Sequence, residues 1–209
     1  MTKSKDKNNN SFYELIKTLF YAGTIAVLFR SILFEPFNIP SGSMIPSLLV
    51  GDYLFVSKYS YGYSRYSFPF GILPIKDRLI YDVPQRGDII VFRKPGDEQV
   101  DYIKRLIGLP GDKIQFIDSN LYINNVEVLK SKIINKDLIY CGQNIIDTYR
   151  FEELLSNGKK YNSVYLKDNS FVNSDLFIVP EKHYFFLGDN RDCSKDSRFL
   201  TSVGYVHED

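Results

Sequence analysis

The feature that most constrains the fold is an apolar segment near the N-terminus, residues 12–34. Its uncharged part, residues 18–29, has twelve residues and is too short to cross a bilayer. Extending it to residues 15–34 gives about twenty residues, which is the length that a spanning helix needs. The extension adds Lys17 and Arg30 near its ends, where long basic side chains reach the headgroups. Because the segment is apolar all round rather than along one stripe, we expect a transmembrane helix and not a buried amphipathic helix.

Basic residues ahead of this segment predict its orientation. Membrane proteins carry an excess of Lys and Arg on the cytoplasmic side, so we expect residues 1–11 to be a cytoplasmic tail. Everything after residue 35 would then lie on the far side of the membrane. The tail is polar and rich in Asn and Lys, and we expect it to be disordered. No small-x-small cleavage pattern follows the segment, which favours an uncleaved anchor over a signal peptide. The lysines that set the orientation are Lys3, Lys5, Lys7 and Lys17.

After residue 35 the sequence predicts β structure. Short apolar runs rich in β-branched and aromatic residues alternate with Gly-Asp and Pro-Gly-Asp turns. Helical periodicity is weak, and its best window, residues 148–155, is short. The chain has 16 Tyr and 16 Phe but no Trp, which is typical of a β core rich in Tyr and Phe. We expect strands at residues 53–56, 88–92, 113–117, 121–123, 164–166 and 184–187.

Composition limits the domains and the function classes. The 209 residues suffice for a core, at residues 35–118 and 180–209, with a less regular inserted lobe at residues 119–179. The net charge of +1 and the lack of a basic stripe argue against nucleic acid as a partner. Cys141 and Cys193 lack metal-site spacing, so we expect no metal and no cofactor. Outside the cytoplasm the two cysteines could pair, but their number does not establish a disulfide.

A serine loop is the first candidate for chemistry. Residues 40–48 read Pro-Ser-Gly-Ser-Met-Ile-Pro-Ser-Leu. Pro40 and Pro46 restrict the backbone, and Gly42 permits close approach of a substrate. The loop could therefore present one hydroxyl, together with backbone N–H groups, to a substrate carbonyl. Because Ser/Gly loops are usually plain turns, the loop alone does not establish catalysis.

A nucleophilic serine needs a general base, and a lysine is the candidate here. Histidine is the usual partner, but neither His183 nor His207 has a catalytic context. Burial can lower the pKa of a lysine by roughly 3–5 pH units, which yields a neutral amine near neutral pH. Strand alternation places Tyr102 and Leu106 on the same face as Lys104. A solvated strand lysine is the common alternative.

A dense polar loop follows the apolar run at residues 184–187. Residues 188–198 read Gly-Asp-Asn-Arg-Asp-Cys-Ser-Lys-Asp-Ser-Arg, a composition suited to Asx turns and Asp–Arg pairs. A cation-binding loop is the alternative, but the closing glutamate and the spacing of an EF-hand are missing.

Taken in order, these motifs closely resemble those of bacterial type I signal peptidases. The resemblance covers about residues 12–206, with the lobe matched only in kind. It implies a mostly β fold: a β-barrel or β-sheet core with a smaller inserted β-rich lobe, preceded by one transmembrane helix. It also implies a membrane-anchored serine endopeptidase that cleaves signal peptides from exported preproteins after an Ala-x-Ala-like site. The motifs are Ser-Gly-Ser-Met-x-Pro-Ser-Leu from Ser41, Gly51-Asp, Arg86-Gly-Asp-Ile-Ile-Val-Phe, Asp101-Tyr-Ile-Lys-Arg-x-x-Gly-x-Pro-Gly-Asp, and the loop from Gly188.

The resemblance also implies a role for individual residues. Ser43 would be the nucleophile, and Lys104 would be the base that takes its proton and later activates water. The oxyanion hole would use the Ser43 backbone N–H and the Ser41 hydroxyl. An extended Ala-x-Ala segment would bind in a cleft with small pockets. The positions that match this cleft are Phe37, Ile39, Pro40, Met44, Leu48, Tyr102 and Ile103.

Residues of the last motif would support the lysine. The resemblance implies that Ser194 hydrogen-bonds and orients the amine. Asp196 and Arg198 would form a structural ion pair, and Gly188 would leave room beside the amine.

Two features depart from the family pattern. Cys193 stands where a small polar residue is common, so we expect a free thiol with a packing role near the active site. The family normally continues with β structure beyond the position of Asp209, so we expect either a short member or part of a longer chain.

Two other functions fit parts of the sequence. A self-cleaving repressor-type protease shares the Ser/Lys pair, but it is soluble and carries a DNA-binding domain, whereas this chain has an anchor and no helix-turn-helix pattern. An inactive membrane-tethered peptide-binding module is the second alternative, although every catalytic position is filled. We expect a monomer whose partners are preprotein signal peptides and membrane lipid.

Overall fold

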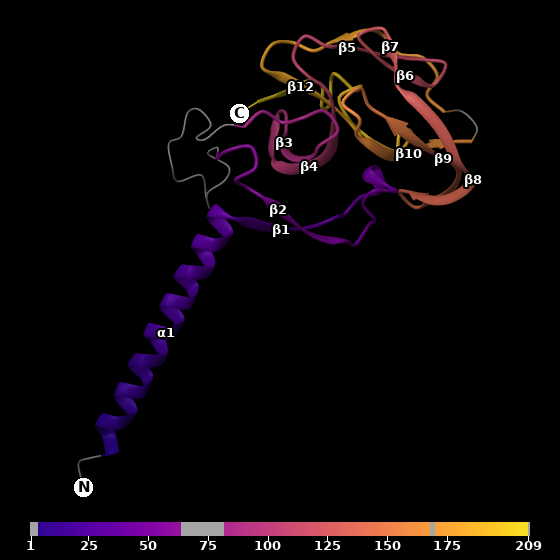
Figure 1. The fold of residues 1–209 in the computed structure, drawn as a ribbon. Coiled ribbons are helices and arrows are strands. Elements are labelled where there is room, and N and C mark those ends of the chain that lie inside the picture. Colours follow the sequence, from indigo (N-terminus) through magenta and orange to yellow (C-terminus); the bar gives the residue numbers. More distant parts are fainter. Residues whose placement is uncertain (1–3, 64–81, 168–169, 209) are drawn as a thin grey trace. The chain divides into compact units, whose positions relative to one another are not determined.

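The computed structural model describes residues 4–63, 82–167 and 170–208 (Figure 1), without the side chains of residues 4–10 and 135. Lys3 of the predicted tail lies outside the described residues. The helical elements are α1 (Ser4–Ile32) and the short 3₁₀ helix η1 (Gly42–Met44). The strands are β1 (Phe34–Asn38), β2 (Tyr53–Ser57), β3 (Ile89–Lys94), β4 (Asp97–Gly108), β5 (Lys113–Ile117), β6 (Asn120–Ile123), β7 (Val126–Glu127), β8 (Leu129–Cys141), β9 (Asn144–Leu154), β10 (Lys160–Leu166), β11 (Phe177–Ile178), β12 (His183–Leu187) and β13 (Val206–His207).

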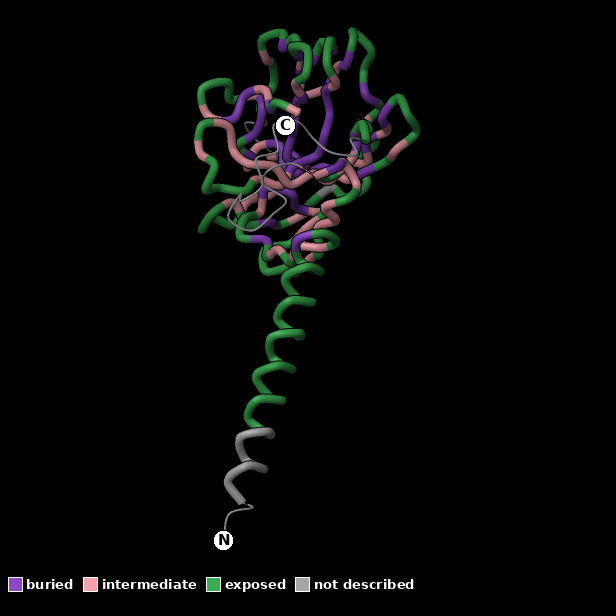
Figure 2. Tube along the Cα trace, turned by 90° about the vertical axis from the view of Figure 1, so that its left-hand side faces the viewer, coloured by how far each residue is buried: buried purple, intermediate pink, exposed green. Residues whose placement is uncertain are grey.

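The first of two compact units, Met1–Phe37 with Leu54–Asp82, contains α1. Within this helix, Ser11–Ile32 has 22 residues and is long and apolar enough to cross a membrane, by length and composition. Its length of about 33 Å matches the hydrocarbon thickness of a bilayer. Figure 2 shows that residues 11–30 are exposed on all sides, as in a helix that faces lipid. The helix begins at Ser4, so the expected disorder is wrong for residues 4–11, because each residue added to an existing helix gains a hydrogen bond.

The second unit, Asn38–Tyr53 with Val83–Asp209, is built from antiparallel β-sheets. Their strand orders are β13-β12-β4-β3, β11-β5-β6-β7 and β10-β9-β8. The prediction of a mostly β protein preceded by one apolar helix is confirmed, and each predicted run overlaps a strand. The predicted Gly-Asp turns also form, for instance at Gly87 and Gly111, where φ is 94° and 84° and glycine is favoured.

The inserted lobe is β structure, as the weak helical periodicity of the sequence indicates. Residues 148–154, most of the short window with the best helical periodicity, lie in β9, which pairs with β8 on one side and β10 on the other. β-Branched and aromatic residues such as Thr148 and Phe151 favour that pairing over a helix. The stretch from 119 to 179 is more regular than expected, since it carries all of β6 to β11. The division into tail, anchor, core and lobe stays a prediction.

Strand β4 confirms the predicted alternation around Lys104. Leu106 packs in one apolar cluster with Phe186. Ile107, its neighbour, packs in a different cluster with Phe185. Lys104 therefore shares the face of Leu106 and lies beside an apolar core.

Candidate active site

The short helix η1 holds the predicted nucleophile. The Ser43 side chain is nearly buried, and its Oγ lies 3.4 Å from the Oγ of Ser41. Glycine at position 42 leaves room for the close packing of this turn. A Cβ at Gly42 would lie 2.9 Å from Cδ1 of Ile45 and 3.1 Å from the carbonyl oxygen of Tyr140. The turn therefore presents two hydroxyls side by side.

Lys104 reaches this turn from β4. Its Nζ donates a hydrogen bond to Ser43 Oγ at 2.7 Å and another to the Ile103 carbonyl at 3.0 Å. The Tyr102 ring centroid lies 5.1 Å from Nζ, and Lys104 is only 4% exposed. The two residues that the sequence singled out, 61 positions apart, are therefore in direct contact.

Burial decides the protonation of Lys104. It lowers the pKa of the amine from its ordinary value of 10.5 to about 8, whereas the carboxylates of Asp196 and Asp189 act in the opposite direction. Both carboxylates are themselves paired with arginines, which limits their effect. A large fraction of Lys104 is therefore neutral at mildly alkaline pH, as a general base requires.

Gly188 and Ser194 lie next to the nucleophile turn. A Cβ at Gly188 would lie 2.2 Å from Ser194 Oγ and 2.5 Å from the Ser43 carbonyl oxygen, so glycine is required here. A side chain at position 188 would therefore clash with Ser194 and the nucleophile turn, and not with the lysine amine as we expected. Ser194 Oγ is buried and has no hydrogen-bond partner among the described residues. The predicted hydrogen bond from Ser194 to Lys104 is thus not formed in this structure, although the hydroxyl lies at the site.

Asp196 and Arg198 form the expected ion pair. The Arg198 Nε donates to Asp196 Oδ1 at 2.8 Å, and its Nη2 donates to Oδ2 at 2.9 Å. Asp196 Oδ2 also accepts the Gly188 N–H at 3.0 Å. The pair therefore closes the loop around residues 188–198.

A second buried pair, Arg105 with Asp189, was not predicted. The Arg105 Nε and Nη2 donate to the two carboxylate oxygens of Asp189, each at 2.7 Å. The Asp189 oxygen also accepts the Ser47 hydroxyl at 2.5 Å, which ties this pair to the segment after η1. The signal was present in the sequence, because Asp189 belongs to the polar loop and Arg105 follows the candidate base.

A third pair, Glu153 with Arg191, anchors the same loop to β9. Its N–O distance is 2.9 Å, and both side chains are 1% exposed. Burial alone would raise the pKa of Glu153, but Arg191 and three hydroxyl donors lower it below its ordinary value, so the carboxylate stays charged. No sequence signal marked Glu153. The hydroxyl donors are Tyr161, Ser163 and Tyr165.

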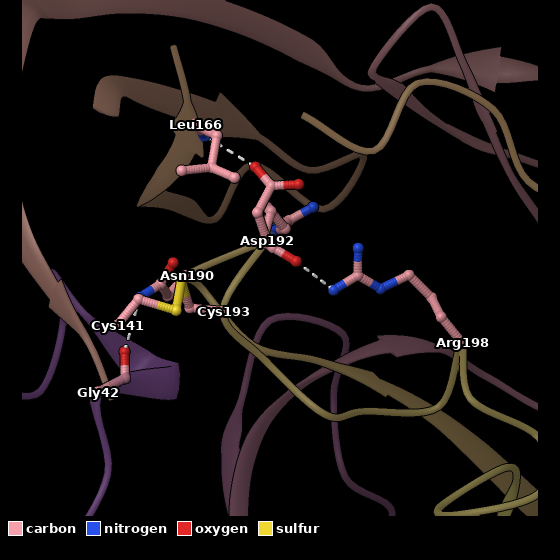
Figure 3. Close-up of a disulfide and its surroundings, with 8 residues drawn as sticks. Gly42, Cys141, Leu166, Asn190, Asp192, Cys193 and Arg198 are labelled. Atoms are coloured by element: carbon pink, nitrogen blue, oxygen red, sulfur yellow. Dashed lines mark hydrogen bonds between the residues drawn. A yellow bond between two sulfur atoms is a disulfide. The ribbon is translucent and has the colours of Figure 1, made fainter. Parts of the chain in front are cut away.

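Cys141 and Cys193 form a disulfide, shown in Figure 3. The free thiol expected at Cys193 is therefore wrong, and the pairing that the sequence left open is present. The bond joins the end of β8 to the loop that carries Ser194.

The predicted cleft residues differ in exposure. Ile39 and Met44 are buried, at 2% and 0% exposure, and act as core side chains around η1. Phe37 belongs to the first unit. Pro40 is exposed, whereas three more are partly buried: Leu48, Tyr102 and Ile103. Across residues 4–63, 82–167 and 170–208, no group of three or more His, Cys, Asp or Glu side chains could hold a metal ion.

Comparison with known proteins gives consistent matches. Residues 12–209 match the family described as signal peptidase, peptidase S26. A signal peptidase I of Rickettsia typhi is 42% identical over 99% of this chain and 79% of its own length. A signal peptidase I of Rickettsia conorii is 47% identical over 87% of this chain and 70% of its own. A crystal structure of a signal peptidase I from Enterococcus faecalis V583 is 30% identical, covers 61% of this chain and 92% of its own, and gives a TM-score of 0.34.

Proposed function

The chain belongs to the signal peptidase family, peptidase S26, and on this premise we propose that Ser43 and Lys104 form its catalytic pair. It is a serine peptidase that removes signal peptides from preproteins, and its N-terminal helix fits a membrane anchor. Family membership removes the repressor-type alternative. The observation that carries the proposal is the 2.7 Å contact between Lys104 Nζ and Ser43 Oγ in a buried setting.

The reaction begins with proton transfer from Ser43 to the neutral amine of Lys104. Ser43 Oγ attacks the scissile carbonyl carbon, and Nζ takes the hydroxyl proton. The resulting ammonium then protonates the leaving amine, which releases the mature protein and leaves an ester on Ser43. Nζ next removes a proton from water, and the hydroxide attacks the ester carbon. The Ser43 oxygen then leaves and takes the proton from Nζ, which frees the signal peptide and restores the pair.

The oxyanion that forms during attack needs donors. We assign these to the Ser43 backbone N–H and the Ser41 hydroxyl, which lies 3.4 Å from Ser43 Oγ. In serine proteases, one such donor contributes about 3–4 kcal/mol to the transition state. In the same proposal, Ser194 turns its unpartnered hydroxyl to the Lys104 amine once substrate is bound, while Gly188, Asp196 and Arg198 support the loop.

The proposed substrate binds as an extended peptide, and its recognition depends on this conformation. We propose that an Ala-x-Ala-like segment adds as a strand beside β4, so that backbone hydrogen bonds provide affinity and two shallow pockets read the small side chains. Buried Met44 and Ile39 would form pocket floors, which would explain a limit on side-chain size. The other proposed cleft positions within the second unit are Pro40, Leu48, Tyr102 and Ile103.

Cleavage of a preprotein tests this proposal. The detergent-solubilised chain should cut a preprotein after its Ala-x-Ala site, and mass spectrometry of the mature N-terminus identifies the bond. Replacing the alanine before the cleaved bond with phenylalanine should lower kcat/KM by at least roughly 100-fold, because a closed pocket cannot admit the ring. Ser43→Ala is the control for contaminating proteases. Cleavage by Ser43→Ala at the wild-type rate would contradict the proposal, and an inactive wild type would favour the peptide-binding module.

We also propose the orientation and the working state of the enzyme. Lysines at positions 3, 5, 7 and 17 place the N-terminus in the cytoplasm at the inner membrane, with the β-rich unit on the periplasmic side. The disulfide supports an oxidising compartment. One chain carries every residue of the site, so we propose a monomer in contact with lipid and signal peptides, which light scattering of the detergent complex would test.

Protease protection tests the orientation. In right-side-out vesicles, added protease should digest the chain after residue 35, whereas in inverted vesicles this part should resist until detergent is added. Lysed vesicles serve as the control for intrinsic resistance. Protection in right-side-out vesicles would reverse the assignment.

A further inference from the structure

The disulfide connects the catalytic loop, residues 188–198, to the β8–β9 hairpin, which is distant in sequence. Cys193 directly precedes Ser194, and Cys141 is the last residue of β8, 52 positions earlier. Figure 3 shows the bond beside Gly42 and Asn190, at the point where three segments meet. These segments are the nucleophile turn, the catalytic loop and the tip of the β8–β9 hairpin.

On the loop side, Asn190 holds the nucleophile turn through two hydrogen bonds. Its backbone N–H donates to the Ser43 carbonyl at 3.1 Å, and its Nδ2 donates to the Gly42 carbonyl at 3.0 Å. The Gly42 carbonyl belongs to the same planar peptide unit as the Ser43 N–H, and in a trans peptide the two groups point in opposite directions. Fixing the Gly42 carbonyl therefore fixes the direction of the N–H that we assign to the oxyanion hole.

On the hairpin side, the tip forms the other wall of the turn. The Tyr140 carbonyl oxygen would lie 3.1 Å from a Cβ at Gly42, and Ile139 packs in a small apolar cluster with Ile45 and Val164. Further side chains of the tip contribute little packing, since Leu138, Tyr140 and Ile145 are about 60% exposed. The disulfide is thus the covalent tie that keeps the tip against the loop.

We propose that the Cys141–Cys193 disulfide is a positioning element of the catalytic reaction, which holds Asn190 against the nucleophile turn and so aims the Ser43 N–H. This inference rests on the proposed function of Ser43. Formation of the bond removes two electrons and two protons from the two thiols. A disulfide-containing oxidant accepts them and becomes two thiols. The enzyme therefore reaches full turnover only after its β-rich unit has met an oxidising compartment.

The proposal is tested by steady-state kinetics of the full chain in detergent, measured at a temperature well below the melting temperature of the protein. Reduction of the wild type should lower kcat by about 10- to 100-fold and leave KM within about twofold, because the transition state and not substrate binding loses a donor. Cys141→Ser/Cys193→Ser is the matched control. It should show the reduced kcat and should not respond to the reductant. A lower melting temperature with unchanged kcat would overturn the proposal, because the bond would then act only on stability.

A double-mutant cycle separates positioning from general stabilisation. Asn190→Ala should lower kcat in the oxidised wild type about as much as reduction does. In the Cys141→Ser/Cys193→Ser background it should change kcat by less than about twofold, since both changes act through the same peptide unit. If Asn190→Ala lowered kcat by the same factor in both backgrounds, the disulfide and Asn190 would act independently and the proposal would be contradicted.

Amide hydrogen exchange tests, without any substrate, whether the disulfide orders the nucleophile turn. Reduction should speed exchange of the Ser43 amide and of residues 189–193, and should leave the β5–β6 hairpin unchanged. If the oxidised enzyme cut no preprotein, the proposed function would fail. Faster exchange at Ser43 would still support the positioning role, and unchanged exchange would reject it.

Discussion

Replacing Lys104 with methionine is expected to lower kcat/KM for a preprotein by roughly 10⁴-fold or more, the scale at which serine proteases lose activity without their base. Methionine keeps the length of the side chain and removes the amine that lies 2.7 Å from Ser43 Oγ. Single-turnover cleavage in detergent measures the loss. Residual activity within tenfold of the wild type would reject Lys104 as the base.

Stability is the first control, because the loss must not reflect unfolding. The depression of the Lys104 pKa from 10.5 to about 8 corresponds to about 3 kcal/mol of penalty on the buried ammonium. This penalty is full below pH 8 and is relieved as the pH rises toward 10.5, because between these values the unfolded chain binds the extra proton. Lys104→Met should therefore melt no lower than the wild type at pH 7.

Lys130 offers a matched control lysine. Burial lowers the pKa of its amine as well, and its Nζ donates to the Ser119 carbonyl at 2.6 Å and lies over the Tyr165 ring. Lys130→Met removes a shielded amine without touching Ser43, so its kcat/KM should stay within about twofold of the wild type. Equal losses in the two variants would point to a general effect of removing buried charge.

The strands of the core were predictable because local patterns and tertiary pairing agree there. Residues 113–117 alternate between polar and apolar and end in turns, and the structure has β5 over the same residues. The hairpin of β8 and β9 was not predicted. β8 is an edge strand whose lysines and partly exposed apolar residues hide the alternation, and its pairing depends on β9 and not on its own pattern.

The candidate site also has residues that local sequence patterns predict and residues that depend on tertiary packing. Alternation in β4 and the order of the motifs identified Lys104 and Ser43, whose contact the structure provides. Glu153 could not be found this way, since one of two adjacent glutamates without a recognisable partner is expected to be exposed to solvent, yet its side chain is buried against Arg191. The partner of Cys193 depends on the path of the intervening 52 residues, which no local pattern specifies.

The pH profile of the wild type provides the second large effect. With a Lys104 pKa of about 8, only about 1% of the amine is neutral at pH 6, half at pH 8 and about nine-tenths at pH 9. Because the base must be neutral, kcat/KM should rise roughly tenfold per pH unit below pH 7, more slowly between pH 7 and pH 9, and level off above pH 9. The total increase from pH 6 to pH 9 should approach roughly 100-fold, measured as initial rates in buffers of constant ionic strength.

A histidine that must lose its proton could also make kcat/KM fall at acid pH, in the acid limb of the profile. The chain allows a test of this alternative because it has two histidines, His183 and His207. Their imidazole rings contact each other, with centroids 4.9 Å apart, and neither ring hydrogen-bonds to Ser43 among the described contacts. In His183→Gln/His207→Gln the acid limb should therefore keep its midpoint near pH 8. A limb that disappears or moves by more than about one pH unit in this variant would transfer the role of base from Lys104 to a histidine.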